Sequence, residues 1–317
     1  MKKILLTTTA MVAFAGAASA EVSLSGYAEM GIIGGSAAGF ETQFHNDIDV
    51  KFTLSGETDN GLTFGATIDL DEVTNVGDDN GIPNTGNDSS VFISGGFGTI
   101  TMGDTDGAFD WAMQEVGDNV ANAIADDHTA HAGFNGNSAD GAYDGQVLRY
   151  DNTFGDFGVA ISAEMDDTGV GSTSWGLGVK YNASLGGVDL GLGLAYHDYD
   201  VDSAWGLSVD AKFGNGFRAI LNYSDLGDTD GGGVGETHTG IGLGYTSGAV
   251  SVEANYGIYD EGTNEQSGIG LAVNYDLGGG AVVMAGYGDS DCNLGGSGPV
   301  YGCADESTWS IGLGLSF

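Results

Sequence analysis

The chain is poor in basic residues. It holds 7 Lys and Arg against 45 Asp and Glu in 317 residues. Lys2 and Lys3 lie in the first twenty residues and all acidic residues follow them, so residues 21–317 carry five basic groups against 45 acidic ones. A protein that neutralises nucleic-acid phosphates needs many Lys and Arg side chains. The charge balance therefore excludes a nucleic-acid partner.

Proline and long apolar runs are also scarce. There are 2 Pro residues beside 59 Gly, a composition that fits neither collagen nor a proline-rich linker. After residue 20, Gly, Ser, Asn and Asp interrupt the apolar residues at every second or third position. A transmembrane helix needs about 20 consecutive apolar residues, so none is expected there.

The chain has only two cysteines, Cys292 and Cys303. No histidine lies near them in the sequence, which makes a metal site or a nucleophile a poor interpretation. In an exported protein, two nearby cysteines are expected to form a disulfide, here within the last long loop. Such a bond would mainly restrain that loop.

The first twenty residues, MKKILLTTTAMVAFAGAASA, have the layout of a secretory signal peptide. Two lysines precede a short apolar run, and Ala18-Ser19-Ala20 supplies an A-x-A cleavage site. We expect residues 1–20 to be removed and residues 21–317 to form one domain.

Apolar residues alternate with small or polar ones along nearly the whole remaining chain, which predicts strands. Short glycine-rich links such as SLGG (184–187) alternate with longer polar ones, as in an up-and-down antiparallel meander. One link, about 105–145, is long enough to be functional. The sixteen predicted strands are 21–33, 44–55, 61–72, 88–96, 100–104, 146–153, 157–166, 173–183, 187–198, 203–213, 217–225, 237–246, 250–260, 265–276, 281–288 and 307–317.

Charged residues avoid the apolar phase of these strands. The last nine residues, WSIGLGLSF, place Trp309, Ile311, Leu313, Leu315 and Phe317 on one phase and only Ser and Gly on the other. The apolar phase must face either lipid or a second packed sheet. Glycine on the other phase leaves a wide, wet lumen, so we expect the small residues to line water.

Aromatic residues near the predicted strand ends favour lipid. They include Tyr181, Tyr196, Tyr223, Trp175 and Trp205, all on the apolar phase. The alternative is a secreted, soluble, acidic β-sandwich that acts in binding or adhesion, with the apolar phase turned inward. That protein would need no aromatic girdle, and the sequence therefore favours a sixteen-stranded antiparallel transmembrane β-barrel.

The sequence contains no clear catalytic motif. No G-x-S-x-G motif occurs, and no histidine pairs obviously with Ser and Asp. His128 and His131, beside Asp126 and Asp127, form a candidate metal site, although a solvated loop is the simpler interpretation. The stretches GDTDGAFD and DEVTNVGDDNG hold carboxylates of the kind that Ca²⁺ binds, without an EF-hand pattern. We therefore expect no catalytic residues and no cofactor, with calcium in the loops as a candidate.

Several segments in order resemble the general diffusion porins of purple photosynthetic and related alphaproteobacteria. They are EVSLSGYAEMG, VKFTLSGETDNGLTFGA, VFISGGFGTITMGD, YDLGGGAVVMAGYGD and the terminal Phe317. The resemblance implies a homotrimer in the Gram-negative outer membrane that passes small hydrophilic solutes and ions. It also implies that the loop 105–145 folds into the barrel and narrows it, and that calcium can be bound.

The chain departs from this family at the pore wall. Such porins usually carry a basic cluster there, but HNDIDVKF offers Asp47, Asp49 and then Lys51. A turn near 56–60 would place Asp47 roughly opposite Asp69. We expect a cation-preferring pore, because rings of carboxylates concentrate cations; the alternative is that these acids face extracellular water and bind calcium. The expected pore-lining residues are Asp47, Asp49, Lys51, Asp69, Asp71, Asp104, Asp106, Asp110, Glu115 and Asp118.

Overall fold

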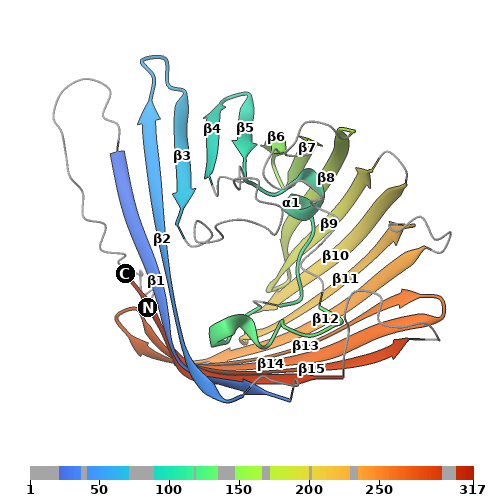
Figure 1. Ribbon diagram of the computed structural model, residues 1–317. Coiled ribbons are helices and arrows are strands. Elements are labelled where there is room, and N and C mark those ends of the chain that lie inside the picture. Colours follow the sequence, from blue (N-terminus) through green and yellow to red (C-terminus); the bar gives the residue numbers. More distant parts are fainter. Residues whose placement is uncertain are drawn as a thin grey trace, which may run out of the picture.

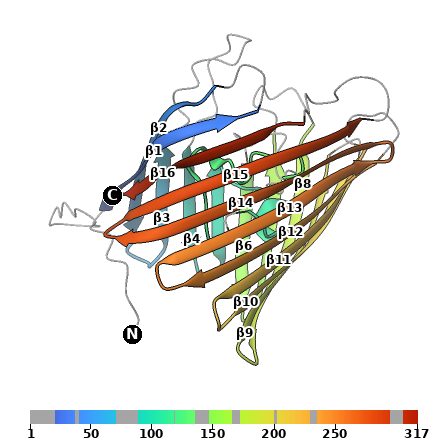
Figure 2. The same cartoon turned by 90° about the horizontal axis from the view of Figure 1, so that it is seen from below.

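Sixteen antiparallel strands close into a barrel in which β1 pairs with both β2 and β16 (Figures 1 and 2). The computed structural model describes residues 21–36, 41–70, 89–117, 119–134, 147–165, 172–199, 202–228, 235–294 and 305–317. The strands are β1 Glu21–Gly35, β2 Gln43–Glu57, β3 Thr63–Asp69, β4 Ser89–Gly95, β5 Gly98–Gly103, β6 Val147–Phe154, β7 Phe157–Glu164, β8 Ser174–Leu185, β9 Val188–Asp198, β10 Ser203–Phe213, β11 Phe217–Gly227, β12 Glu236–Ser247, β13 Val250–Glu261, β14 Asn264–Gly278, β15 Ala281–Leu294 and β16 Ser307–Ser316.

The sixteen-stranded barrel predicted from the sequence is confirmed. The largest difference in strand bounds is at β15, which continues to Leu294, whereas the sequence predicted an end at 288. Its polar continuation pairs with β14 as far as Asn264, because a hairpin can extend beyond the apolar band once its backbone is paired. The proposed signal peptide lies outside the described residues and stays a prediction.

The large side chains of the strands point away from the barrel axis. Leu177, Ile311 and Phe317 are 52%, 52% and 68% exposed, although each belongs to a regular apolar phase. A sandwich would bury this phase against a second sheet, and the closed barrel leaves it on the outside. The soluble-sandwich alternative is therefore wrong, and lipid is the environment that these side chains need. Among the described residues, the helices are too short and too polar to cross a membrane.

Tight turns join the strands at one end of the barrel. In the β8–β9 turn, Gly186 and Gly187 have φ values of 60° and 90°, a left-handed conformation that glycine adopts without steric cost. In the β2–β3 turn, the Thr58 amide donates to the Leu62 carbonyl at 2.8 Å, and the Leu62 amide donates to Thr58 Oγ1 at 2.9 Å. This turn is centred on Asn60, two residues beyond the predicted centre.

The predicted pairing of Asp47 with Asp69 is consequently wrong. The β2–β3 register places Lys51 opposite Asp69, and the β1–β2 register places Glu29 opposite Asp47. A shift of two residues in the turn moves every cross-strand pair by four. The Lys51 ammonium lies 2.9 Å from the Asp69 carboxylate, so the expected repulsion at Asp69 is replaced by an ion pair.

One side of the barrel is built from short strands. β3, β4 and β5 contain 7, 7 and 6 residues, whereas β8 to β15 contain at least 11 each. A tilted strand needs about 9–11 residues to cross a bilayer. In the described part of the chain, this side of the barrel therefore has the shortest strands.

Candidate functional site

The long link between β5 and β6 folds into the barrel, as the resemblance implied (Figure 1). It contains the one-turn helix α1, Ala108–Ala112, and the 3₁₀ turn η2, Ile124–Asp126. α1 contacts β7, β8 and β9, whereas η2 contacts β15, β16 and β1. The inserted loop, residues 104–134, thus follows the inner wall from β7 round to β1.

Wall side chains hold the backbone of the inserted loop. The buried Glu253 carboxylate on β13 accepts hydrogen bonds from the Val120 and Ala121 amides at 2.8 and 3.1 Å. Glu29 on β1 accepts from the Ala125 amide at 2.9 Å. Hydrogen bonds to a charged acceptor contribute about 1.5–3 kcal/mol each, so these two carboxylates are strong anchors.

Neutral groups add further anchors between Glu253 and the start of the loop. Ser162 Oγ accepts from the Ala108 amide at 2.9 Å, and Ser208 Oγ accepts from the Gln114 amide at 3.0 Å. Because every second residue of a strand points inward, hydroxyls and carboxylates on this phase reach the loop while the apolar phase faces out.

Glycines on the inward phase form the surface on which the loop lies. A Cβ at Gly240 would be 3.1 Å from the Val116 side chain, and a Cβ at Gly206 would be 2.7 Å from Phe109 and from Met113. At Gly242 the added atom would meet the Val116 backbone. Only glycine lets two backbones approach so closely without displacing one of them.

The expectation that the small residues line water is therefore wrong for this part of the barrel. The loop covers glycines on β8, β9, β10 and β12 to β16, including Gly312 of the terminal strand, where a Cβ would meet Ile124. Alternation of glycine with large residues looks the same in a sequence whether the glycine faces water or a packed backbone.

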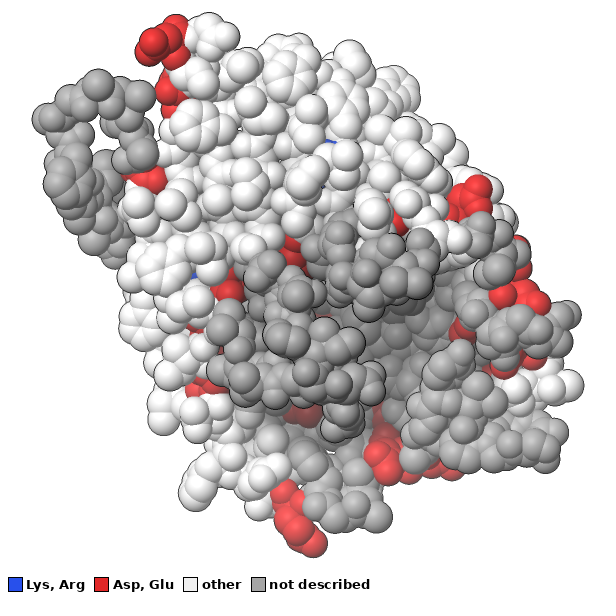
Figure 3. Space-filling model, turned by 45° about the horizontal axis from the view of Figure 1, so that its top comes forward, with Lys and Arg blue, Asp and Glu red and all other residues white. Residues whose placement is uncertain are grey.

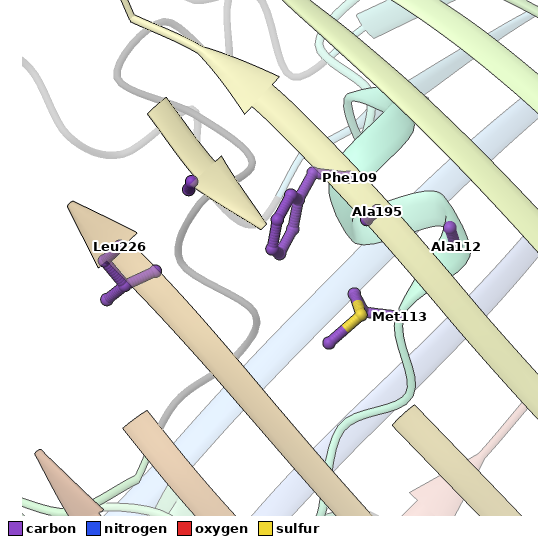
Figure 4. Close-up of a cluster of buried hydrophobic side chains, with 6 residues drawn as sticks. Phe109, Ala112, Met113, Ala195 and Leu226 are labelled. Atoms are coloured by element: carbon purple, nitrogen blue, oxygen red, sulfur yellow. The ribbon is translucent and has the colours of Figure 1, made fainter. Parts of the chain in front are cut away.

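A small apolar cluster fixes α1 against the wall (Figure 4). Phe109 is fully buried and packs with Met113 beneath α1. The wall contributes Ala195, Ala204 and Leu226. Burying a Phe side chain contributes about 1.5–3 kcal/mol. This hydrophobic contribution to the docking of the loop adds to that of the hydrogen bonds above.

Four of the predicted pore-lining residues lie on one stretch of wall, away from α1. Asp47, Asp49 and Lys51 alternate along β2, and Asp69 is on β3. Their phase is inward, because Glu29, which pairs with Asp47, reaches the inserted loop. In Figure 1, these strands and α1 lie on opposite sides of the barrel interior.

The predicted residues of the inserted loop lie near α1. Asp104 begins the loop, where its amide donates to the Ser89 carbonyl at 3.0 Å. Asp106, Asp110 and Glu115 border one hollow of about 250 Å³, together with Lys180 of β8. Asp71 and Asp118, also predicted to line the pore, lie outside the described residues.

The sequence prediction missed a group of basic residues on the wall. Arg149, Lys180, Lys212 and Arg218 belong to β6, β8, β10 and β11. Their inward phase is the signal in the sequence that identifies them. The resemblance implied a basic cluster at HNDIDVKF, but apart from Lys51 the basic residues of the described wall lie on β6, β8, β10 and β11.

Each of these basic groups has a partner. Arg218 forms a two-pronged ion pair with Asp210 at 2.9 and 3.1 Å and donates to the Asn119 carbonyl of the loop. Lys212 lies 3.4 Å from the same carboxylate. Arg149 donates to the Asp106 carbonyl at 2.6 Å. On the described surface, acidic side chains are visible in several places and basic ones barely at all (Figure 3).

The candidate metal site at His128 and His131 is not supported. Both imidazoles belong to the inserted loop and are buried, so the solvated-loop interpretation is also wrong. His131 Nε2 lies 2.6 Å from Asn255 Oδ1. Among the described residues, no group of three His, Cys, Asp or Glu side chains could hold a metal ion. The acidic stretch 71–81 and Cys303 lie outside them, so loop calcium and the Cys292–Cys303 disulfide stay predictions.

Comparison with known proteins agrees with this geometry. A family model described as Gram-negative porin matches residues 7–293. A porin of Rhodobacter capsulatus is 32% identical over 301 residues, which cover 86% of this chain and 95% of that protein. A porin structure refined at 1.8 Å is 28% identical and superposes with a TM-score of 0.71, covering 94% of this chain and 100% of the other. A Rhodopseudomonas blastica porin variant, 18% identical, gives a TM-score of 0.65 over 93% of this chain and 100% of the other.

The Glu253 anchor gives a first prediction. Replacing Glu253 by Ala removes the acceptor of two loop amides and should free the middle of the loop. A charged hydrogen bond contributes about 1.5–3 kcal/mol and 1.4 kcal/mol is a factor of ten, so loss of both bonds should speed chymotryptic cleavage within residues 109–134 by at least about tenfold. Glu253→Gln keeps an uncharged acceptor, so its cleavage rate should lie between those of the unchanged protein and Glu253→Ala. Equal cleavage of all three would contradict the assignment.

The buried His131 gives a prediction on pH. Asn255 donates its amide to the His128 carbonyl at 2.9 Å, so its oxygen faces His131 and accepts from Nε2. His131 Nδ1 has no hydrogen-bond partner among the described residues, and burial lowers the pKa of His131 below its ordinary value of 6.5. A lowered pKa means that docking of the loop is complete above the free value and weakens as the pH falls below it.

Single-channel recording tests this expectation. Acidification from about pH 7.5 to about pH 5 should increase current fluctuations, because protonation adds an unsatisfied N–H⁺ under the loop. His131→Gln keeps a donor toward Asn255 without titrating, and it should reduce the acid response. A response of the same size in that variant would assign it to the carboxylates instead.

Proposed function

Because the chain belongs to the Gram-negative porin family, we propose that the diffusion channel it forms in the outer membrane prefers cations. The supporting observation is that the basic groups of residues 21–317 all have acidic or aromatic partners. Lys51 is paired with Asp69, Lys212 and Arg218 share Asp210, Arg149 is bound to Asp106, and Lys180 lies over Trp111. Five basic groups can neutralise only a few of 45 carboxylates.

The position of the remaining negative charge supports cation entry. Asp47 and Asp49 lie on the wall that the inserted loop does not cover, and Asp106, Asp110 and Glu115 lie on the loop side. A diffusing ion passes between two acidic surfaces rather than between an acidic and a basic one. Carboxylates that line a narrow passage raise the local concentration of cations and exclude anions.

Reversal potentials in a KCl gradient test the preference. At about 0.1 M salt the Debye length is about 10 Å, so wall charges act across the passage. The unchanged channel should reverse near the potassium equilibrium potential. Asp47→Asn with Asp49→Asn should move the reversal potential toward zero and leave the channel open, since both variants keep the size of the side chain.

A matched double variant controls for total charge. Asp59→Asn with Asp156→Asn removes two carboxylates from tight turns at the barrel end, and it should shift the reversal potential less. Near-equal permeability of potassium and chloride in the unchanged channel would refute the cation preference. A shift of the same size in both double variants would place the selectivity outside the β2 wall.

We further propose that three copies assemble through the short-strand side of the barrel. β3 to β5 are the shortest strands described, and they expose Val91, Ile93 and Met102 outward. A neighbouring copy would cover these side chains and close a symmetric ring. The number three comes from the resemblance to trimeric porins.

Particle mass in mild detergent tests the assembly. The unchanged protein should have the mass of three chains. Val91→Arg, on β4, should dissociate it, whereas Leu177→Arg, on the long strand β8, should leave the assembly intact although it costs about 2–4 kcal/mol against lipid. A monomeric or dimeric unchanged protein would contradict the proposal.

A further inference from the structure

Trp111 of α1 borders a hollow between the inserted loop and β8. The hollow has a volume of about 250 Å³ and is lined by Asp106, Asp110, Glu115 and Lys180 besides the indole. It therefore combines an aromatic ring with three carboxylates. Its volume is below the roughly 300–1,000 Å³ of drug-sized ligand sites, so it suits a small solute or one end of a larger one.

The wall is shaped to receive the Trp111 indole. Gly158 on β7 lies beneath it, and a Cβ there would be 2.9 Å from the outer edge of the ring. The Lys180 ammonium lies over the ring, 4.1 Å from its centroid. A cation within about 6 Å of a Trp ring face is attracted by the negative potential of that face.

Lys180 lines the hollow together with the carboxylates of Asp106 and Asp110. The face of the indole and the acidic hollow are thus already occupied by an ammonium group that the chain itself supplies. Lys180 ends a flexible four-carbon stem, so its head can leave the ring while its backbone stays in β8.

We propose that this hollow is a binding station for organic ammonium ions in transit, which displace Lys180 from the Trp111 ring. The inference rests on the proposed cation preference. Organic ammonium ions are the class of cation that the hollow should bind most strongly. An ammonium group with an apolar body gains from both the ring and the carboxylates, whereas a hydrated potassium ion gains mainly from the carboxylates. A neutral solute gains nothing from the charge, and an anion is repelled.

Weak binding is what a channel needs at such a station. A solute must bind well enough to enter and weakly enough to leave. Competition with Lys180 keeps the binding weak, because each incoming ammonium ion must displace the Lys180 ammonium, which stays tethered to the chain. The site would therefore raise the local concentration of organic cations without trapping them.

Block of the potassium current by choline tests the proposal. Choline has a quaternary ammonium head, and 3,3-dimethyl-1-butanol is its uncharged analogue of the same shape. Choline should reduce the current at concentrations at which the analogue does not. Trp111→Ala should raise the half-blocking choline concentration at least about threefold, and Trp111→Phe should raise it less, since a Trp face is the stronger partner.

Lys180→Gln should act in the opposite direction and lower the half-blocking concentration at least about threefold, because the tethered competitor is removed. Lys212→Gln removes the same charge from the wall at a place without an aromatic ring, and it should change the block less than about twofold. If the block depends on charge alone, both lysine variants will lower the half-blocking concentration equally and Trp111→Ala will have no effect.

The outcomes separate this inference from the cation preference. A channel that prefers cations in a KCl gradient but is blocked equally by choline with and without the Trp111 ring would overturn the station alone. A channel without cation preference would overturn the proposed function first. Where Trp111→Ala lowers folding yield, Trp111→Phe and Lys180→Gln still decide the question, because each retains the packing of the loop.

Discussion

Backbone packing of the inserted loop against the inner wall is the contact on which the pore depends. A barrel of sixteen strands encloses more space than side chains can fill. Here the space on one side is occupied by chain, and the strands beneath it carry glycine because any larger residue would meet the loop. The loop then hydrogen-bonds to Glu253, Glu29, Ser162 and Ser208 from the same inward phase. The β2–β3 wall lies across the barrel interior from α1 (Figure 1).

This arrangement also determines where the charges lie. The loop covers a glycine-rich wall and brings Asp106 and Asp110 to a hollow beside Lys180. Four of the basic residues lie on the wall near α1, where they bind the loop or a neighbouring carboxylate. Positive charge thus serves mainly to hold the loop in place. The proposed cation preference and the position of the loop would then depend on the same set of contacts.

The sequence alone predicted the barrel because strand periodicity is a local property. Each strand alternates apolar and small residues, and each tight turn carries glycine, so sixteen strands and their order could be read directly. Cross-strand register was less accessible. A turn centred on Asn60 instead of two residues earlier placed Lys51, not Asp47, near Asp69. The side of the barrel to which the loop docks was not accessible either, because Gly242 and Gly312 look the same in the sequence whether they face water or the loop.

Amide hydrogen exchange in the inserted loop tests the central claim most directly. Gly242→Ala adds one methyl group where the Val116 backbone lies, whereas Gly191→Ala adds one on the same inward phase, where the nearest atom is 3.3 Å away and belongs to the Asn182 side chain. If the loop is held by backbone packing on the wall glycines, the Gln114, Val120 and Ala121 amides exchange faster in Gly242→Ala and at an unchanged rate in Gly191→Ala. Unchanged exchange of these three amides in both variants would contradict it.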